Sequence, residues 1–182
     1  MSVPRVSPIL VVIRNVPIFL VLILSACHTA PPPRQTTPTA APETWDGSGG
    51  ASSMRNRGEA LAKFALSLRG TRYRYGGATR DGFDCSGLVF YAHRQFGLEV
   101  PRTSREQAEE AEEIKPRKLK PGDLVFFRVD SRRVNHVGIY IGERRFVHAP
   151  GAGKPVTINS LDDEFYEESF ASAGRFWEQK PR

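Results

Sequence analysis

The segment Phe83-Asp84-Cys85-Ser86-Gly87-Leu88-Val89 joins a glycine-rich loop to a predicted helix. Asp84 is a residue type that caps helix N-termini, and the helix is predicted to run from Cys85 to about Phe96 and to stop at Gly97. The first N–H groups of a helix are unpaired and carry a partial positive charge, which favours a thiolate over a thiol. Cys85 is therefore the candidate nucleophile, the alternative being a buried, inert cysteine.

Helices flank this segment and strands follow it, which predicts an α+β fold. Apolar residues at helical spacing predict a first helix from about Arg57 that ends before Gly70. A shorter helix is predicted to begin at Thr103 or Ser104, because Ser104 and Gln107 have capping-box spacing. Runs rich in Val, Ile, Phe and Tyr then predict an antiparallel sheet of about five strands, at 124–129, 134–141, 145–149, 156–158 and, after a short polar helix near 162–168, 173–177.

Two of the chain's four histidines, His136 and His148, lie in neighbouring predicted strands. Side chains alternate along a strand, so His136 shares its face with Gly138. A three-residue loop, Gly142-Glu143-Arg144, would pair Gly138 with His148 and bring both imidazoles to one face. A two-residue loop would put them on opposite faces unless a bulge intervened. We therefore predict the three-residue loop or an equivalent bulge.

A third histidine, His93, follows Cys85 on the same predicted helix. More than two turns separate them, or roughly 12 Å of rise, so His93 does not serve the thiol. We expect it on the surface.

The other cysteine of the chain, Cys27, ends the run Leu24-Ser25-Ala26-Cys27 after a short apolar stretch. That stretch is shorter than the roughly 20 apolar residues that span a bilayer, and with Arg5 and Arg14 before it the pattern is typical of a signal peptide. An uncleaved membrane anchor is the alternative. The ending resembles the lipobox of bacterial lipoproteins, in which the cysteine becomes the lipid-modified first residue. If Cys27 is consumed in this way, Cys85 is left as an unpaired thiol in an oxidising compartment, where it is a liability unless its reactivity is used.

These patterns divide the chain into three predicted parts. Residues 1–26 are predicted as the signal peptide, 27–55 as the lipidated Cys27 and a disordered tether rich in Pro, Thr, Ser and Gly, and 56–182 as one globular domain. His28 after Cys27, rather than Asp, looks like the pattern of lipoproteins sent to the outer membrane. In a bacterium with two membranes we therefore expect the domain at the cell envelope, anchored by lipid on the periplasmic face of the outer membrane.

The formal net charge of +6 suits an acidic polymer such as cell wall, and it suits weak nucleic-acid binding equally well. No nucleic-acid motif and no aromatic-basic stripe accompanies it, so nucleic acid is not an expected partner. We expect no cofactor and a monomeric protein.

Five ordered blocks of this sequence resemble the NlpC-type cell-wall peptidases, which are papain-like cysteine hydrolases of bacterial peptidoglycan. They are Tyr73-Arg74-Tyr75-Gly76-Gly77, Asp84-Cys85-Ser86-Gly87-Leu88-Val89, Pro121-Gly122-Asp123-Leu124-Val125-Phe126-Phe127, His136-Val137-Gly138-Ile139-Tyr140-Ile141-Gly142 and Phe146-Val147-His148-Ala149. The resemblance implies a papain-like fold for 56–182, with helices packed on the sheet. It also implies a lipid-anchored endopeptidase that cuts a γ-D-glutamyl–diaminopimelate or a D-alanyl–diaminopimelate bond in the peptide stems or cross-links.

The resemblance also implies residue roles that agree with the reading above. Cys85 would attack the peptide carbonyl, His136 would act as base and then acid, and His148 would orient the ring of His136. Tyr73, together with the backbone N–H of Cys85, would stabilise the oxyanion, unless Tyr73 simply packs. Asp84 and Ser86 match positions that contact the stem peptide in some relatives, and Asp84 is equally well explained as a helix cap.

Two further residues and two further functions stay open. The lack of a side chain at Gly87 would let the helix of Cys85 pack closely on the sheet that carries the histidines. Arg102 would either meet a substrate carboxylate or lie solvated. One Cys and two His are also acceptable zinc ligands, so a zinc-binding module is an alternative, though no Cys-x-x-Cys accompanies them. A non-catalytic wall-binding lipoprotein is another alternative.

Overall fold

A computed structural model describes residues 51–178 of the chain, and the side chains from residue 57 onward. The predicted signal peptide, Cys27, and the predicted tether as far as residue 50 lie outside the described residues. Among the described residues, no helix is both long enough and apolar enough to cross a bilayer.

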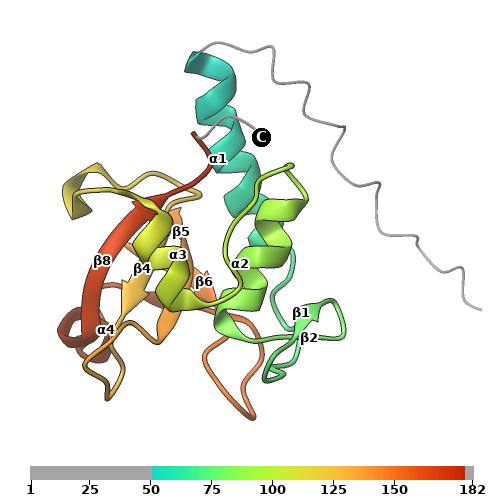
Figure 1. Cartoon of the computed structure of the whole chain (residues 1–182), viewed down its shortest axis with the longest axis vertical. Helices are drawn as coiled ribbons and strands as arrows, with labels where there is room; N and C mark the ends of the chain where they lie inside the picture. The colour runs from blue at the N-terminus through green and yellow to red at the C-terminus, as the bar shows by residue number, and fades with distance from the viewer. Residues whose placement is uncertain (1–50, 179–182) are drawn as a thin grey trace, which may run out of the picture. The chain divides into compact units, whose positions relative to one another are not determined.

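Two helices pack side by side on one part of the sheet (Figure 1). Helix α1 spans Ala51–Leu66 and helix α2 spans Cys85–Arg94, and both contact strand β5. Helix α1 begins earlier than predicted. At the predicted start, the buried Arg57 anchors the helix, because its guanidinium donates to the backbone oxygens of Phe96 and Trp177.

Helix α3 spans Ser104–Glu110 and is capped differently from the prediction. Thr103 is the N-cap and forms a capping box with Glu106, so the predicted Ser104–Gln107 box is wrong. Gln107 is instead buried, and its side-chain amide donates to the backbone oxygens of Ser86 and Pro101. The bond to Ser86 joins α3 to the start of α2, and the bond to Pro101 joins it to the connection between the two helices.

Within residues 51–178 the main sheet has six strands in the order β3-β8-β4-β5-β6-β7, and every neighbouring pair is antiparallel. The prediction missed the short edge strand β3. The strands are β3 (Glu112–Glu113), β4 (Leu124–Phe127), β5 (His136–Gly142), β6 (Arg145–His148), β7 (Thr157–Ser160) and β8 (Phe170–Arg175). The smaller elements are the hairpin β1 (Ala78–Thr79) and β2 (Gly82–Phe83), the 3-10 helix η1 (Pro116–Lys118) and helix α4 (Glu164–Ser169). The predicted α+β class is confirmed.

The two faces of the sheet bury two separate apolar clusters. In β4, Leu124 and Phe126 belong to the cluster beneath α1 and α2, while Val125 and Phe127 belong to the cluster on the opposite face. Both faces of β4 are covered, which explains why this strand reads as an unbroken apolar run.

A β-bulge in the hairpin of β5 and β6 sets which side chains of the two strands share a face. Its connection is the two-residue turn Glu143-Arg144, with positive φ at both residues, and not the predicted three-residue loop. The register shifts between Tyr140 and Gly142, which is the equivalent bulge that we predicted. Because Ile139 then pairs with Val147, His136 and His148 share one face of the sheet.

The prediction for His93 is wrong, because its side chain is fully buried. The ring packs edge-on against Phe176, and Nδ1 bonds to the backbone oxygen of Val89 one turn earlier. The face of α2 that holds His93 covers the C-terminal segment of the domain, which the helical period of α2 does not reveal.

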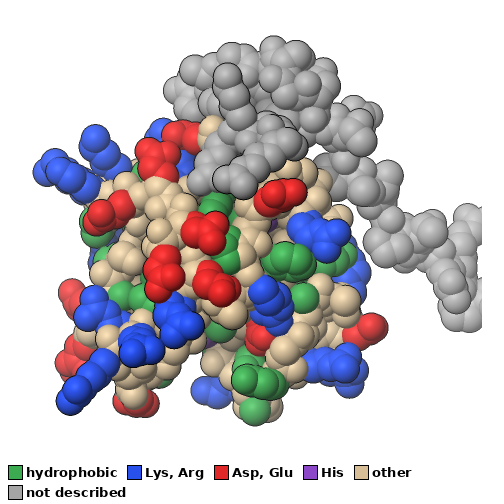
Figure 2. Space-filling view, in the orientation of Figure 1, with side chains coloured by type: hydrophobic (Ala, Val, Ile, Leu, Met, Phe, Trp, Pro, Cys, Tyr) green, Lys and Arg blue, Asp and Glu red, His purple; other side chains and the backbone are tan. Residues whose placement is uncertain are grey.

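Charges on the surface are mixed in sign. Figure 2 shows acidic side chains gathered over α3, where Glu106, Glu109 and Glu110 are exposed, with Lys and Arg side chains around them. The net positive charge of the chain is therefore not concentrated on this face.

Candidate active site

A pocket of about 230 Å³ lies at the end of the sheet where the start of β5, a central strand, meets the start of α2. Six separate stretches of the chain supply its walls, so only the folded domain assembles it. The lining residues are Tyr73, Cys85, Val129, Asn135, His136, Ala149, Pro150, Phe165 and Tyr166.

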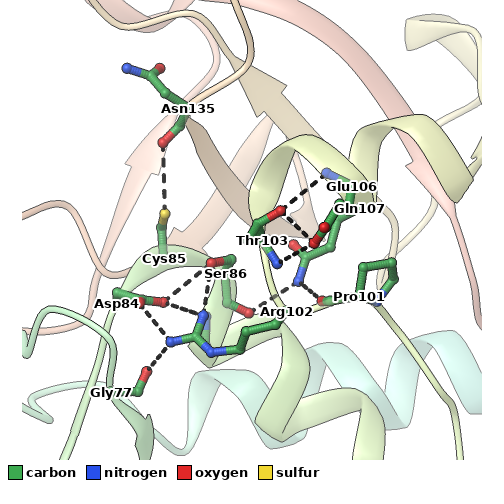
Figure 3. Close-up of polar contacts among 11 residues, drawn as sticks. Gly77, Asp84, Cys85, Ser86, Pro101, Arg102, Thr103, Glu106, Gln107 and Asn135 are labelled. Carbon is green, nitrogen blue, oxygen red and sulfur yellow. Dashed lines mark hydrogen bonds and ion pairs between the residues drawn. The ribbon is translucent and has the colours of Figure 1, made fainter.

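Cys85 is the first residue of α2, as predicted. Asp84 is the N-cap, and its Oδ1 accepts a bond of 2.6 Å from the backbone N–H of Gly87. The thiol Sγ lies 4.0 Å from the backbone oxygen of Asn135, the residue just before β5 (Figure 3).

Opposing influences act on the thiol of Cys85. Burial raises its pKa, and the carboxylate of Asp84 raises it further. The backbone N–H groups of Ser86, Val137 and Cys85 lower it, but they do not outweigh the burial. A helix start therefore does not by itself give a thiolate here, and the free thiol needs a base.

The two predicted imidazoles lie in direct contact. His136 Nε2 is 2.7 Å from His148 Nδ1, and His148 Nε2 is 2.9 Å from Asn159 Oδ1. The amide of Asn159 is oriented in turn, since its Nδ2 donates to Asp163 Oδ2 at 3.2 Å. A chain of four side chains thus runs inward from Asp163 to His136.

The proton positions follow from this chain of contacts. An amide oxygen only accepts, so His148 Nε2 carries a proton and donates to Asn159. Neutral His148 then has a bare Nδ1, and that nitrogen accepts from His136 Nε2–H. Neutral His136 is left with a bare Nδ1, which can take a proton. His136 thus has an unprotonated ring nitrogen, and it lines the same pocket as Cys85.

Both rings are neutral at physiological pH. Burial lowers the pKa of His136 to about 3, with a smaller contribution from His148, and burial lowers the pKa of His148 to about 4. Burial also lowers the pKa of His93, in the core, to about 4.

We expect acid to destabilise the domain through these three histidines. Each has a pKa of about 6.5 in an unfolded chain, so between that value and the lower folded value the unfolded state binds more protons. The free energy of unfolding should fall as the pH drops below about 6.5, by about 2 kcal/mol per histidine between pH 7 and pH 5. Above pH 7 these groups are neutral in both states and add no further change.

Urea unfolding at pH 5, 6 and 7 measures this effect. A His93→Gln variant is the control, because it removes one titrating group that lies far from the pocket. Its free energy of unfolding should depend less steeply on pH than that of the wild type. An equal slope for the two proteins would contradict the role of His93.

The structure assigns local partners to the other predicted site residues. Tyr73 lines the pocket, and burial raises the pKa of its hydroxyl. The capping role of Asp84 is confirmed, and contact of Asp84 and Ser86 with a stem peptide stays a prediction. Arg102 is partly exposed but is not an unpaired surface arginine, because its guanidinium pairs with Asp84 at 2.7 Å (Figure 3).

The prediction for Gly87 named the wrong packing partner. A Cβ at Gly87 would lie 1.9 Å from the backbone oxygen of Gly77, so the close neighbour is the loop before β1 and not the sheet. The start of α2 is therefore fitted to the loop that follows Tyr73.

The geometry gives the zinc alternative no support. Among the described residues, no three His, Cys, Asp or Glu side chains converge where a metal ion could bind.

Sequence reasoning missed Asn159 and Asp163, which orient His148. The available signal was the polar Asn159 directly after the predicted strand at 156–158. Phe165 and Tyr166 were also missed as pocket residues, since α4 reads only as a polar surface helix.

A cysteine at a helix start that shares a pocket with an imidazole on an antiparallel sheet defines the papain-like class, as the resemblance implied. The family model described as the NlpC/P60 family matches residues 70–175. The chain therefore belongs to the NlpC/P60 family.

Curated relatives and solved structures agree with this membership. The chain is 42% identical over 118 residues to the probable endopeptidase NlpC homolog of Haemophilus influenzae, covering 64% of this chain and 62% of that protein. It is 44% identical over 108 residues to the murein DD-endopeptidase MepS/murein LD-carboxypeptidase of Escherichia coli K12, and this match covers 59% of this chain and 56% of that protein. A crystal structure of an NlpC/P60 family protein from Bacillus cereus matches with a TM-score of 0.63 and 31% identity, covering 66% of this chain and 40% of that one. The matches thus span about three fifths of the length of these two curated relatives.

Proposed function

We propose that this chain is a peptidoglycan hydrolase, a cysteine endopeptidase that cleaves peptide stems or cross-links by an acyl-enzyme mechanism. The observation that carries the proposal is the tautomer chain, which leaves a bare Nδ1 on His136 in the pocket lined by Cys85. Family membership and the endopeptidase names of the relatives support it.

The reaction begins with a neutral pair. The Cys85 thiol gives its proton to His136 Nδ1 as the sulfur attacks the peptide carbonyl carbon, and His148 accepts from the resulting imidazolium. The backbone N–H of Cys85 and the hydroxyl of Tyr73 donate to the oxyanion. His136 then protonates the departing amine, and water hydrolyses the thioester that remains on Cys85.

Two bonds fit this chemistry, the γ-D-glutamyl–diaminopimelate bond and the D-alanyl–diaminopimelate bond. The name of the Escherichia coli relative supports the second. Digestion of purified peptidoglycan by the full chain, with products identified by mass spectrometry, tests the activity and identifies the bond. Cys85→Ala is the matched control. New peptides from the wild type alone support the proposal, whereas binding without turnover favours the wall-binding lipoprotein and defeats it.

The anchoring proposal is separate from the activity. We propose that Cys27 carries lipid and holds the domain on the periplasmic face of the outer membrane, as a monomer. The ending Leu24-Ser25-Ala26-Cys27 and the following His28 support this. Labelling with palmitate in cells should mark the wild type and leave Cys27→Ala unlabelled. Equal labelling of the two proteins would refute it.

A further inference from the structure

One guanidinium ties three segments together behind the thiol (Figure 3). Arg102 lies in the connection between α2 and α3, and its side chain is about one third exposed. Its Nη1 donates to Asp84 Oδ1 at 2.9 Å and to Ser86 Oγ at 3.0 Å. Its Nη2 donates to Asp84 Oδ2 at 2.7 Å and to the backbone oxygen of Gly77 at 3.3 Å.

The contacts of Arg102 within the protein already use the N–H donors that a bidentate ligand would need. The two terminal nitrogens of Arg102 carry four N–H bonds in total, and four acceptors within the protein already take them. A substrate carboxylate would have to displace Asp84, which also caps α2. The contacts therefore favour a role for Arg102 inside the protein.

The position of Asp84 gives that role a chemical purpose. Asp84 precedes Cys85 directly, so capping the helix places a negative charge beside the sulfur that must become negative. The other titratable groups that line the pocket with Cys85 are Tyr73, His136 and Tyr166, and all three are neutral at rest. Arg102 is thus the cation that faces the Asp84 charge.

We propose that Arg102 is a positioning residue for Cys85: it fixes the Asp84 cap, Ser86 and Gly77, and it offsets the Asp84 charge so that the thiol can ionise. The inference rests on the proposed function, since it concerns activation of the same thiol. The Asp84 carboxylate raises the pKa of Cys85, and the Arg102 cation opposes that effect.

The pH dependence of Cys85 alkylation by iodoacetamide tests the inference without any substrate. The reagent is uncharged, so its approach does not depend on Arg102. In Arg102→Met of the full chain, with Cys27 also changed to alanine in every protein compared, the midpoint of the alkylation rate should rise by about one pH unit. Below that midpoint the rate should fall about tenfold. Adding Asp84→Asn to Arg102→Met should reverse most of the rise, because the uncompensated charge is then gone.

Three further variants exclude a merely structural effect. Arg105→Met removes an exposed arginine of α3 and should leave the midpoint unchanged. Arg102→Lys keeps the charge and should keep the midpoint within a few tenths of a unit. Asp84→Asn alone keeps a capping residue and should lower the midpoint.

Each outcome decides the inference. An unchanged midpoint in Arg102→Met, or a rise that Asp84→Asn does not reverse, overturns it. If Arg102→Met does not fold, the Asp84→Asn midpoint decides, and no fall there defeats the inference. A chain with the expected shifts that fails to cut peptidoglycan would instead sink the proposed function alone.

Discussion

Replacing His136 by alanine is expected to lower the rate of stem-peptide cleavage about 10⁴-fold. The reason is the neutral resting state of the pocket. Burial holds the pKa of the Cys85 thiol above its ordinary value, so the sulfur becomes a nucleophile only by handing its proton to a base. In the proposed mechanism that base is the bare Nδ1 of His136, and the later protonation of the amine uses the same ring.

Cleavage of a soluble muropeptide under single-turnover conditions measures this loss. Asn159→Leu is the informative comparison, because it keeps the base but frees His148 to change tautomer. Its loss of rate should be smaller than that of His136→Ala. Circular dichroism and thermal unfolding should show both variants folded. A His136→Ala variant that cuts within tenfold of the wild type would rule out His136 as the base.

Replacing Asp123 by alanine is expected to cost about 3–5 kcal/mol of the free energy of unfolding. Asp123 is fully buried and accepts four hydrogen bonds. Two of them come from Arg175, which is also buried, and the others from Trp177 Nε1 and the backbone N–H of Lys120. Without the carboxylate, the Arg175 charge stays in the interior, and among the described residues the half-buried Glu178 is the carboxylate that remains paired with it.

Urea unfolding at pH 7 measures this effect, and the chain offers a matched surface pair. Asp162 forms an ion pair with Arg144, and both side chains are more than half exposed. Asp162→Ala should cost no more than about 1 kcal/mol, since water screens exposed pairs. Should the two alanine variants lose equal stability, the buried pair would stabilise the domain no more than the surface pair does.

The sequence by itself determined the features that depend on a few neighbouring residues. Asp84 caps the helix that begins at Cys85 because the cap and its N–H donor lie three residues apart. The apolar runs of the second half became strands of an antiparallel sheet for the same local reason, since β-branched and aromatic residues suit a pleated, buried surface. The α+β class and the placement of Cys85 needed nothing more.

For the pairing of β5 with β6, the sequence reduced the possible connections to two but did not choose between them. His136 and His148 could share one face of the sheet only with a three-residue loop, or with a two-residue loop and a bulge. The sequence pattern allowed either. The structure has the bulge, because Glu143 and Arg144 both adopt left-handed φ values and close a two-residue turn. Turn conformation at non-glycine residues depends on the strands that the turn joins.

Only the tertiary structure decided which distant groups meet. His93 is buried because its face of α2 covers Phe176. Arg102 pairs with Asp84 because the connection between α2 and α3 folds back over the start of α2. Asn159 completes the histidine chain from a strand added later in sequence. Helical and strand periods act over a few residues, whereas a hydrogen bond or a buried ring depends on which segments the whole fold brings within about 3–4 Å.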